Sequence, residues 1–241
     1  MGIRAFRTCM ALVLALAACG SPPSSPVPGE TGTSAPPASG SPIPAASVTG
    51  EPVDSNCIEF DAESTYLFTV GTLPVSLTVP ASPSQPWHGS ATSFSLARGS
   101  CAAGADAVPY FHAALVGRVY ADACHWTAAT VEAPTASDVI KELKRQVGHP
   151  PPNAVETELG FFRATRLDIP LPRDFDVSGC DEGEMRLWAD ELLAPGVSLQ
   201  VYVAEVDGAS LVVTVGFDAA TTTPADLEEI DAILASLRVE M

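Results

Sequence analysis

Residues 197–217 read VSLQVYVAEVDGASLVVTVGF, and this stretch decides the fold. Its centre, Asp207-Gly208, is a dipeptide that favours a type I′ turn, because both residues tolerate a positive φ. Apolar side chains recur at every second position on both sides of the turn, as in strands that bury one face: Leu199, Val201 and Val203, then Leu211, Val213, Val215 and Phe217. The stretch therefore predicts a β-hairpin of residues 197–206 and 209–217.

A helix is predicted on either side of this hairpin. The downstream helix spans residues 224–236, with Thr223 as N-cap, Pro224 at the first helical position and Asp226 at the third. The upstream helix spans residues 137–147 and follows a T-x-x-D capping pattern. The expected buried stripes are Val139, Ile140, Leu143 and Val147 in the upstream helix, and Leu227, Ile230, Leu234 and Leu237 in the downstream one.

Shorter alternating or apolar segments predict the remaining strands, at residues 66–70, 75–79, 92–96, 118–120, 154–158, 163–169 and 185–188. Strands outnumber helices, and the helices come singly between hairpins. This order is typical of an α+β domain with a mostly antiparallel sheet and two main helices. Residues 54–241 are ample for one such domain with a sizeable core.

The N-terminal residues 1–18 predict a lipoprotein signal peptide. Arg4 and Arg7 precede a short apolar run, which ends in Leu16-Ala17-Ala18-Cys19 and so fits a bacterial lipobox. The Cys19 thiol is the nucleophile that would accept a diacylglycerol group. The apolar run is far shorter than the ~20 residues that span a bilayer. An ordinary secretory signal that contains a cysteine is the alternative.

Residues 19–53 comprise the lipidated Cys19 and a linker rich in Pro, Ser, Gly, Ala and Thr. Such a composition cannot bury enough apolar surface to offset its ordering entropy, so we expect the linker to be disordered. It would serve as a stalk through part of the envelope or as a plain spacer.

The net charge of −17 argues against nucleic acid as a partner and against electrostatic adhesion to anionic lipid. Removal of residues 1–18 would take away two arginines and no acids, which makes the mature chain more acidic still.

The domain holds four cysteines: Cys57, Cys101, Cys124 and Cys180. An even number in an exported domain favours two disulfides, and four cysteines allow three pairings. A zinc site is the alternative, but neither C-x-x-C nor H-x₃-H spacing occurs.

We find no catalytic motif in the sequence, and we expect neither an enzyme nor a cofactor. A G-x-S-x-G elbow, a P-loop and a G-x-G-x-x-G fingerprint are all missing from the folded domain. The histidines are scattered, and only His125 has an acid close in sequence, Asp122. A Ser–His–Asp arrangement assembled from distant residues is the remaining catalytic alternative.

The segment Asp174-x-Asp176-x-Ser178-Gly179 matches positions 1, 3, 5 and 6 of a calcium loop. Position 12, however, is Met185, and Glu184 falls one residue short. We interpret the segment as an acidic loop with Asx-type turns, and we expect no metal.

Several motifs together resemble a domain found in actinobacterial lipoproteins and exported proteins of unassigned role. They are Asp122-Ala-Cys124-His125-Trp126, the helix after Thr135, the segment VSGCDEGE at 177–184 before Trp188, and the ending 233–240. The resemblance covers roughly residues 66–241 and implies pairing of Cys124 with Cys180, which leaves Cys57 with Cys101. The order of elements is also similar to the PsbP-like α/β/α sandwich. Neither resemblance supplies a catalytic residue.

These observations predict a lipid-anchored lipoprotein on the extracytoplasmic face of the cell membrane, most simply a binding module for an envelope ligand or partner protein. The alternatives are a hydrolase acting on wall or lipid material and a structural or chaperone-like accessory. The implied Cys124–Cys180 bridge would gather a candidate binding rim, because aromatic side chains supply contact area at low entropic cost. Its predicted members are Trp126, Asp181, Glu182, Glu184 and Trp188.

Overall fold

The computed structural model describes residues 58–81, 85–90, 94–99, 109–147, 151–189 and 191–240. The predicted signal peptide, the lipidation site Cys19 and the linker lie outside the described residues, as do Cys57 and Cys101. The elements, in chain order, are β1 (Ile58–Phe60), β2 (Ser64–Val70), β3 (Leu73–Val79), β4 (Trp87–Gly89), β5 (Ser95–Arg98), β6 (Tyr110–Leu115), β7 (Arg118–Tyr120), β8 (Thr130–Glu132), α1 (Ala136–Gln146), β9 (Asn153–Leu159), β10 (Phe162–Pro170), the 3₁₀ turn η2 (Asp181–Gly183), β11 (Met185–Trp188), β12 (Glu191–Leu193), β13 (Ser198–Val206), β14 (Ala209–Phe217), α2 (Pro224–Ser236) and β15 (Arg238–Val239).

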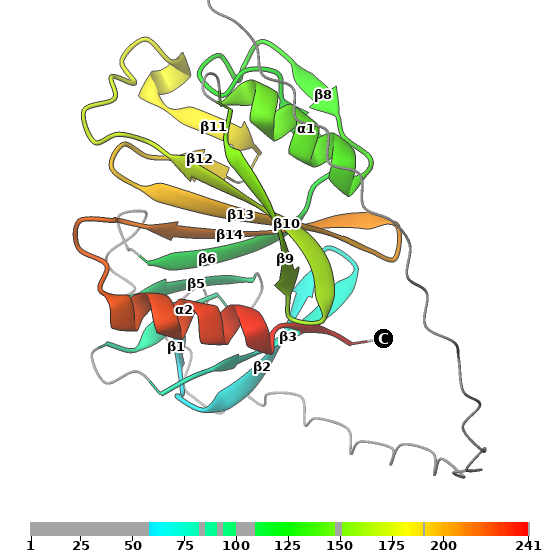
Figure 1. Cartoon of the computed structure of the whole chain (residues 1–241), viewed down its shortest axis with the longest axis vertical. Helices are drawn as coiled ribbons and strands as arrows, with labels where there is room; N and C mark the ends of the chain where they lie inside the picture. Colours follow the sequence, from blue (N-terminus) through cyan, green and yellow to red (C-terminus); the bar gives the residue numbers. More distant parts are fainter. Residues whose placement is uncertain are drawn as a thin grey trace, which may run out of the picture. The chain divides into compact units, whose positions relative to one another are not determined.

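A central sheet of eight strands, in the order β1-β4-β5-β6-β14-β13-β10-β9, organises the described part of the chain (Figure 1). A three-stranded sheet, β15-β3-β2, and two ribbons, β11-β12 and β7-β8, pack around it. Neighbouring strands in the central sheet run antiparallel throughout the described residues. The predicted α+β class with a mostly antiparallel sheet and two helices is therefore confirmed.

The predicted hairpin forms the middle of this sheet. β13 pairs with β14 from Ser198↔Phe217 to Val206↔Ala209. Asp207 and Gly208 both have positive φ, at 51° and 78°, as a type I′ turn requires.

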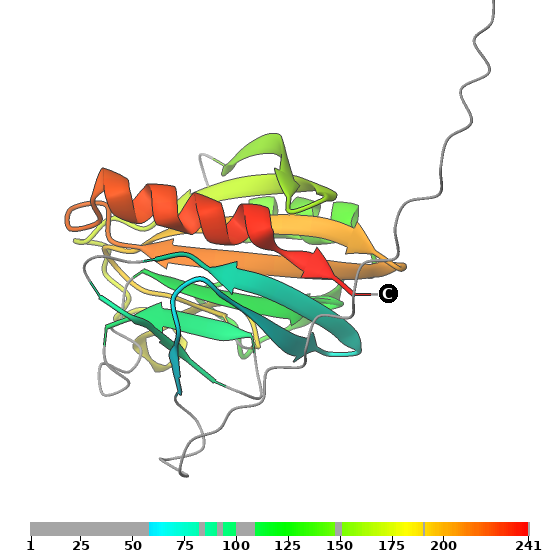
Figure 2. The ribbon, with the colours of Figure 1, turned by 90° about the horizontal axis from the view of Figure 1, so that it is seen from below.

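Alternate residues of the hairpin pack into two separate apolar cores, one on each face of the sheet. Leu199, Val201 and Val203 belong to the core that contains α1, β11 and β12. Leu211, Val213 and Val215 belong to the core that contains α2, β2 and β3. Figure 2 shows α2 running along one side of the long strands β13 and β14. The two helices thus cover opposite faces of the central sheet.

α2 begins at the predicted residue, Pro224, and α1 begins at Ala136, one residue before the predicted start. Thr223 and Asp226 form a complete capping box at the start of α2, and the Thr135 hydroxyl accepts from the Asp138 N–H at the start of α1. The predicted stripes need correction. Leu227 is 39 % exposed while Ile233 is buried.

The buried side of α1 also includes two polar residues, Glu142 and Gln146. The Gln146 side-chain amide donates to the carbonyl oxygens of Tyr120 (2.6 Å) and Leu187 (2.7 Å), which accounts for its burial.

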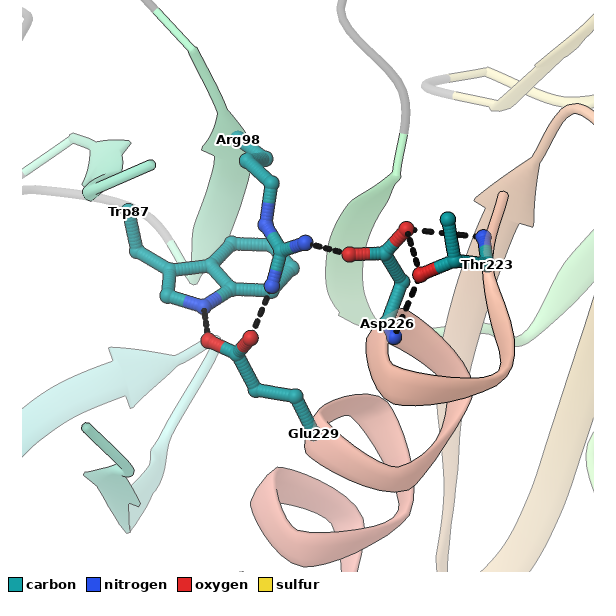
Figure 3. A network of polar contacts seen from close by, with 5 residues as sticks. All are labelled: Trp87, Arg98, Thr223, Asp226 and Glu229. Atoms are coloured by element: carbon teal, nitrogen blue, oxygen red, sulfur yellow. Dashed lines mark hydrogen bonds and ion pairs between the residues drawn. The ribbon is translucent and has the colours of Figure 1, made fainter. Parts of the chain in front are cut away.

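A buried ionic network joins α2 to strands β4 and β5 of the central sheet (Figure 3). Arg98, only 6 % exposed, donates to Asp226 from one terminal nitrogen and to Glu229 from the other. The indole N–H of Trp87 donates to the second oxygen of Glu229. Arg98 also lies over the Trp87 ring, with Cζ 5.1 Å from the ring centroid. One guanidinium thus satisfies two carboxylates on successive turns of α2.

The strands predicted from the sequence were incomplete. The strand predicted to end at residue 96 continues to Arg98, the last residue of β5, and six short strands were not predicted: β1, β4, β6, β8, β12 and β15. The β6 sequence, YFHAAL, has neither turn residues nor clear alternation, yet it pairs with β14 along its whole length. β6 also pairs with β5, and its partners in β14 lie about a hundred residues away, where no local pattern reports them. Within the described residues, the helices are too short and too polar to cross a membrane.

Candidate functional site

Cys124 and Cys180 form a disulfide, with a Cα–Cα distance of 4.5 Å, as the resemblance implied. Cys180 is buried in the core on the α1 side. Two backbone hydrogen bonds run alongside the bridge, from Asp181 N to Cys124 O and from Arg186 N to Ala123 O, both 2.8 Å. The loop before Trp126 is therefore tied covalently and by hydrogen bonds to η2. The predicted Cys57–Cys101 pair lies outside the described residues.

The bridge brings Trp126 and Asp181 together, as predicted for the rim. The indole N–H of Trp126 donates to the Asp181 carbonyl oxygen at 3.2 Å. Thr127 donates to the Asp181 carboxylate from its backbone N–H (2.8 Å) and from its hydroxyl. His125 Nδ1 lies 3.5 Å from the other carboxylate oxygen. Asp122, the acid nearest to His125 in sequence, instead accepts from the backbone N–H groups of Cys124 and His125.

Trp188 does not belong to the rim. It is only 4 % exposed and packs in the core on the α1 side. Trp188 is the last residue of β11, and its side chain is buried where the ribbon β11-β12 packs against the core. The spacing of residues in the sequence does not reveal this burial.

The rim contains a cation that the sequence-based prediction missed. Arg186 Cζ lies 4.7 Å from the centroid of the Trp126 ring. Arg186 also donates to Glu184 at 2.7 Å. Tyr120 packs beside Trp126 with a centroid separation of 5.7 Å. Trp126 is half-buried, and Glu182 is exposed. The name "rim" is kept below for Trp126, Asp181, Glu182, Glu184 and Arg186.

Hydrogen bonding at the rim lowers the pKa of Asp181 below its ordinary value. The Thr127 hydroxyl is the largest cause, followed by the Thr127 backbone N–H, and His125 adds to the effect. Because the folded-state pKa is lowered, Asp181 stabilises the fold at pH values above the unfolded pKa of ~3.9, and this contribution is lost as the pH falls through the folded-state pKa.

Thr127→Ala should therefore raise the pKa of Asp181 part of the way towards its ordinary value, because the backbone N–H of residue 127 still donates. The carboxyl carbon shift of Asp181, followed by NMR over an acid titration, measures this change. An Asp181 midpoint that is the same in both proteins would show that the hydroxyl does not stabilise the carboxylate.

The acidic loop at 174–179 contains the expected Asx-type turn, since the Asp176 carboxylate accepts from the Ser178 N–H at 2.9 Å. Within the described ranges, His, Cys, Asp and Glu side chains nowhere gather in threes that could hold a metal ion.

A second polar cluster, missed by sequence reasoning, lies on the α1 face of the central sheet. Glu191 of β12 is 3 % exposed. It accepts from the Tyr110 hydroxyl at 3.1 Å and from the Thr214 hydroxyl at 2.8 Å, and His112 Nδ1 lies 3.3 Å away. Burial, with Glu191 beside it, raises the pKa of Tyr110. We call these four residues the Glu191 cluster.

Residues far apart in sequence form this cluster, since Glu191 lies 79 positions after His112. Gly216 permits the arrangement, because a Cβ at this position would lie 2.0 Å from the Tyr110 ring. A histidine with a buried carboxylate on one ring nitrogen is the arrangement by which proteins orient an imidazole for proton transfer.

Comparison with known proteins yields little. No known protein family matches the chain, and no curated protein does so either. A crystal structure from Bacteroides thetaiotaomicron VPI-5482 matches with a TM-score of 0.34 and 9 % sequence identity. The match covers 69 % of this chain and 45 % of that one, so the chain spans less than half the length of the matched protein. A likeness this distant carries no argument about fold or function.

Proposed function

We propose that the chain is a lipoprotein anchored through Cys19 to the extracytoplasmic face of the cell membrane, where its domain binds an envelope ligand or partner protein. The observation that carries the proposal is the Cys124–Cys180 disulfide at the base of the rim. Disulfides persist in oxidising compartments outside the cytoplasm, which agrees with export. We also propose that the domain is similar to actinobacterial exported domains and, in its fold, to the PsbP-like α/β/α sandwich.

The geometry of the rim supports binding. Trp126 and Arg186 are stacked, and both residue types are enriched among the side chains that dominate binding energies. The Asp181 carboxylate already accepts from Thr127, and Glu184 is already paired with Arg186. Glu182, by contrast, is exposed and has a φ of 54°. Because the disulfide holds both loops in place, little conformational entropy would be lost on binding. A structural or chaperone-like accessory role would use the same surface.

The tether is tested by Cys19→Ser. The variant should lose incorporation of labelled fatty acid and leave the membrane fraction, since the serine hydroxyl does not accept the diacylglycerol group. Fractionation of cells followed by immunoblotting measures the distribution. Unchanged processing and membrane association in the variant would contradict the lipoprotein assignment.

The rim is tested with a photo-crosslinking amino acid placed at Glu182 in living cells. We expect a discrete crosslinked species, which Trp126→Ala removes. The same amino acid at Glu228, an exposed acidic position on α2, serves as the matched control and should give none. Equal crosslinking from both positions, or crosslinking from Glu182 that survives Trp126→Ala, would exclude the rim as the binding surface.

A further inference from the structure

One cross-strand row of the central sheet changes from apolar to polar along its length. On the α1 face, Val201 of β13 pairs with Thr214 of β14, Thr214 pairs with His112 of β6, and His112 pairs with Ser95 of β5. Directly paired residues in an antiparallel sheet share a face, with Cβ atoms about 4.5–5.5 Å apart. Ser95 and His112 therefore lie on the same face of the sheet, the face on which Glu191 contacts Nδ1 of the imidazole.

We propose that Ser95, His112 and Glu191 form a nucleophile–base–acid triad for acyl transfer from a carboxylic ester. This inference does not depend on the rim or on the tether. It rests on three residues from three strands, β5, β6 and β12, that the fold brings to one place.

Glu191 supplies the acid. Hydroxyl groups of Tyr110 and Thr214 both donate to its carboxylate, so the ionised form, which only accepts hydrogen bonds, fits this site. An ionised Glu191 places the imidazole proton of His112 on Nδ1, because that nitrogen faces the carboxylate. Nε2 then carries the lone pair that would take a proton from the nucleophile.

Ser95 supplies the nucleophile. It is half-buried and is the first residue of β5. Its backbone carbonyl accepts a hydrogen bond from the Ser90 N–H at 3.2 Å, which holds the backbone in place at this point. Hydrogen bonds between nucleophile and base are often long before substrate binds, so cross-strand proximity is the geometric requirement at this stage.

The chemistry balances without a cofactor. The Ser95 hydroxyl gives its proton to His112 Nε2 as Oγ bonds to the ester carbonyl carbon. The bond from that carbon to the alkoxy oxygen then breaks, and the imidazolium returns the proton to the leaving alcohol. Water then gives a proton to His112 as its oxygen bonds to the acyl carbon, the bond from that carbon to Ser95 Oγ breaks, and the imidazolium returns the proton to Oγ. The products are an acid and an alcohol, and Glu191 keeps its charge throughout.

The test treats the full-length protein, purified in detergent, with a biotinylated fluorophosphonate. This reagent phosphonylates an activated serine and releases fluoride. We expect one labelled peptide, containing Ser95, and no labelling of Ser95→Ala. His112→Gln and Glu191→Gln should slow labelling on the order of 10²–10⁴-fold, the range that a general base contributes. Ser198→Ala, which alters another half-buried strand serine, should label like the parent.

Circular dichroism and thermal melting establish that each variant is folded, and Glu191→Gln preserves the size of the side chain. Labelling of a folded parent at a different serine, an absence of labelling, or equal rates in the parent and in His112→Gln would each overturn the triad. The cluster would then be a structural hydrogen-bond network.

Discussion

Replacing both bridged cysteines, with Cys124→Ala and Cys180→Ala together, should lower the free energy of unfolding by about 4 kcal/mol. The two cysteines are 56 residues apart, and the segment between them includes α1 and the β9–β10 hairpin. In the chain-entropy model a loop of this length places the disulfide near the upper end of the usual range. Denaturant titration of both proteins, followed by fluorescence and circular dichroism, measures the difference.

The double substitution leaves no free thiol at the site, so disulfide exchange cannot compensate for the loss. Reduction of the parent should produce a similar fall in stability. A loss below about 1 kcal/mol would mean that the two loops are held mainly by their hydrogen bonds and that the bridge adds little constraint.

The second large effect concerns Arg98. Arg98→Met keeps the length of the side chain but leaves Glu229, 9 % exposed, without its cation. Removal of one partner from a buried ion pair costs about 3–5 kcal/mol, because the remaining charge stays desolvated. We therefore expect a loss of this size in the free energy of unfolding, measured by the same denaturant titration.

The matched control is Arg118→Met, which removes an arginine whose ion pair with Glu132 is exposed, at 67 % and 66 %. Exposed pairs contribute about 0–1 kcal/mol. Arg98→Met combined with Glu229→Gln should recover part of the loss, since the amide oxygen can still accept from Trp87. Equal losses for Arg98→Met and Arg118→Met would contradict the assignment of this network as the anchor of α2.

The same network gives the fold an acid-sensitive component. Burial tends to raise the pKa of Asp226, but hydrogen bonds from Thr223 and the charge of Arg98 outweigh it, and the folded-state pKa is lowered. A lowered carboxyl pKa stabilises the fold above the unfolded value of ~3.9 and loses this effect as the pH falls through the folded value. In Asp226→Asn, the free energy of unfolding should therefore fall less steeply as the pH is lowered than it does in the parent protein.

Local patterns predicted the parts of the fold that are determined locally. The Asp207-Gly208 turn and the Thr223–Asp226 capping box involve neighbouring residues, and both formed as predicted. The pairing of β6 with β14 and the ion pair of Arg98 with Asp226 join residues about a hundred or more positions apart in sequence. A single sequence carries no signal for such pairings.

In the candidate site, too, the features that the sequence predicted differ from those that depend on tertiary packing. The disulfide followed from a motif resemblance, and it places Trp126 beside Asp181. Burial of Trp188 and stacking of Arg186 depend on how the ribbon β11-β12 packs, which spacing does not reveal. The Glu191 cluster depends on the register of β6 against β14 and on a fourth residue from β12, so the sequence could show only scattered histidines.

Mass spectrometry of the protein, extracted from membranes and digested without reduction, tests the lipid anchor and the disulfide most directly. We expect an acylated N-terminal peptide that begins at Cys19, and a disulfide-linked pair of peptides that contain Cys124 and Cys180. Recovery of an unmodified N-terminus together with reduced Cys124 and Cys180 would contradict both assignments.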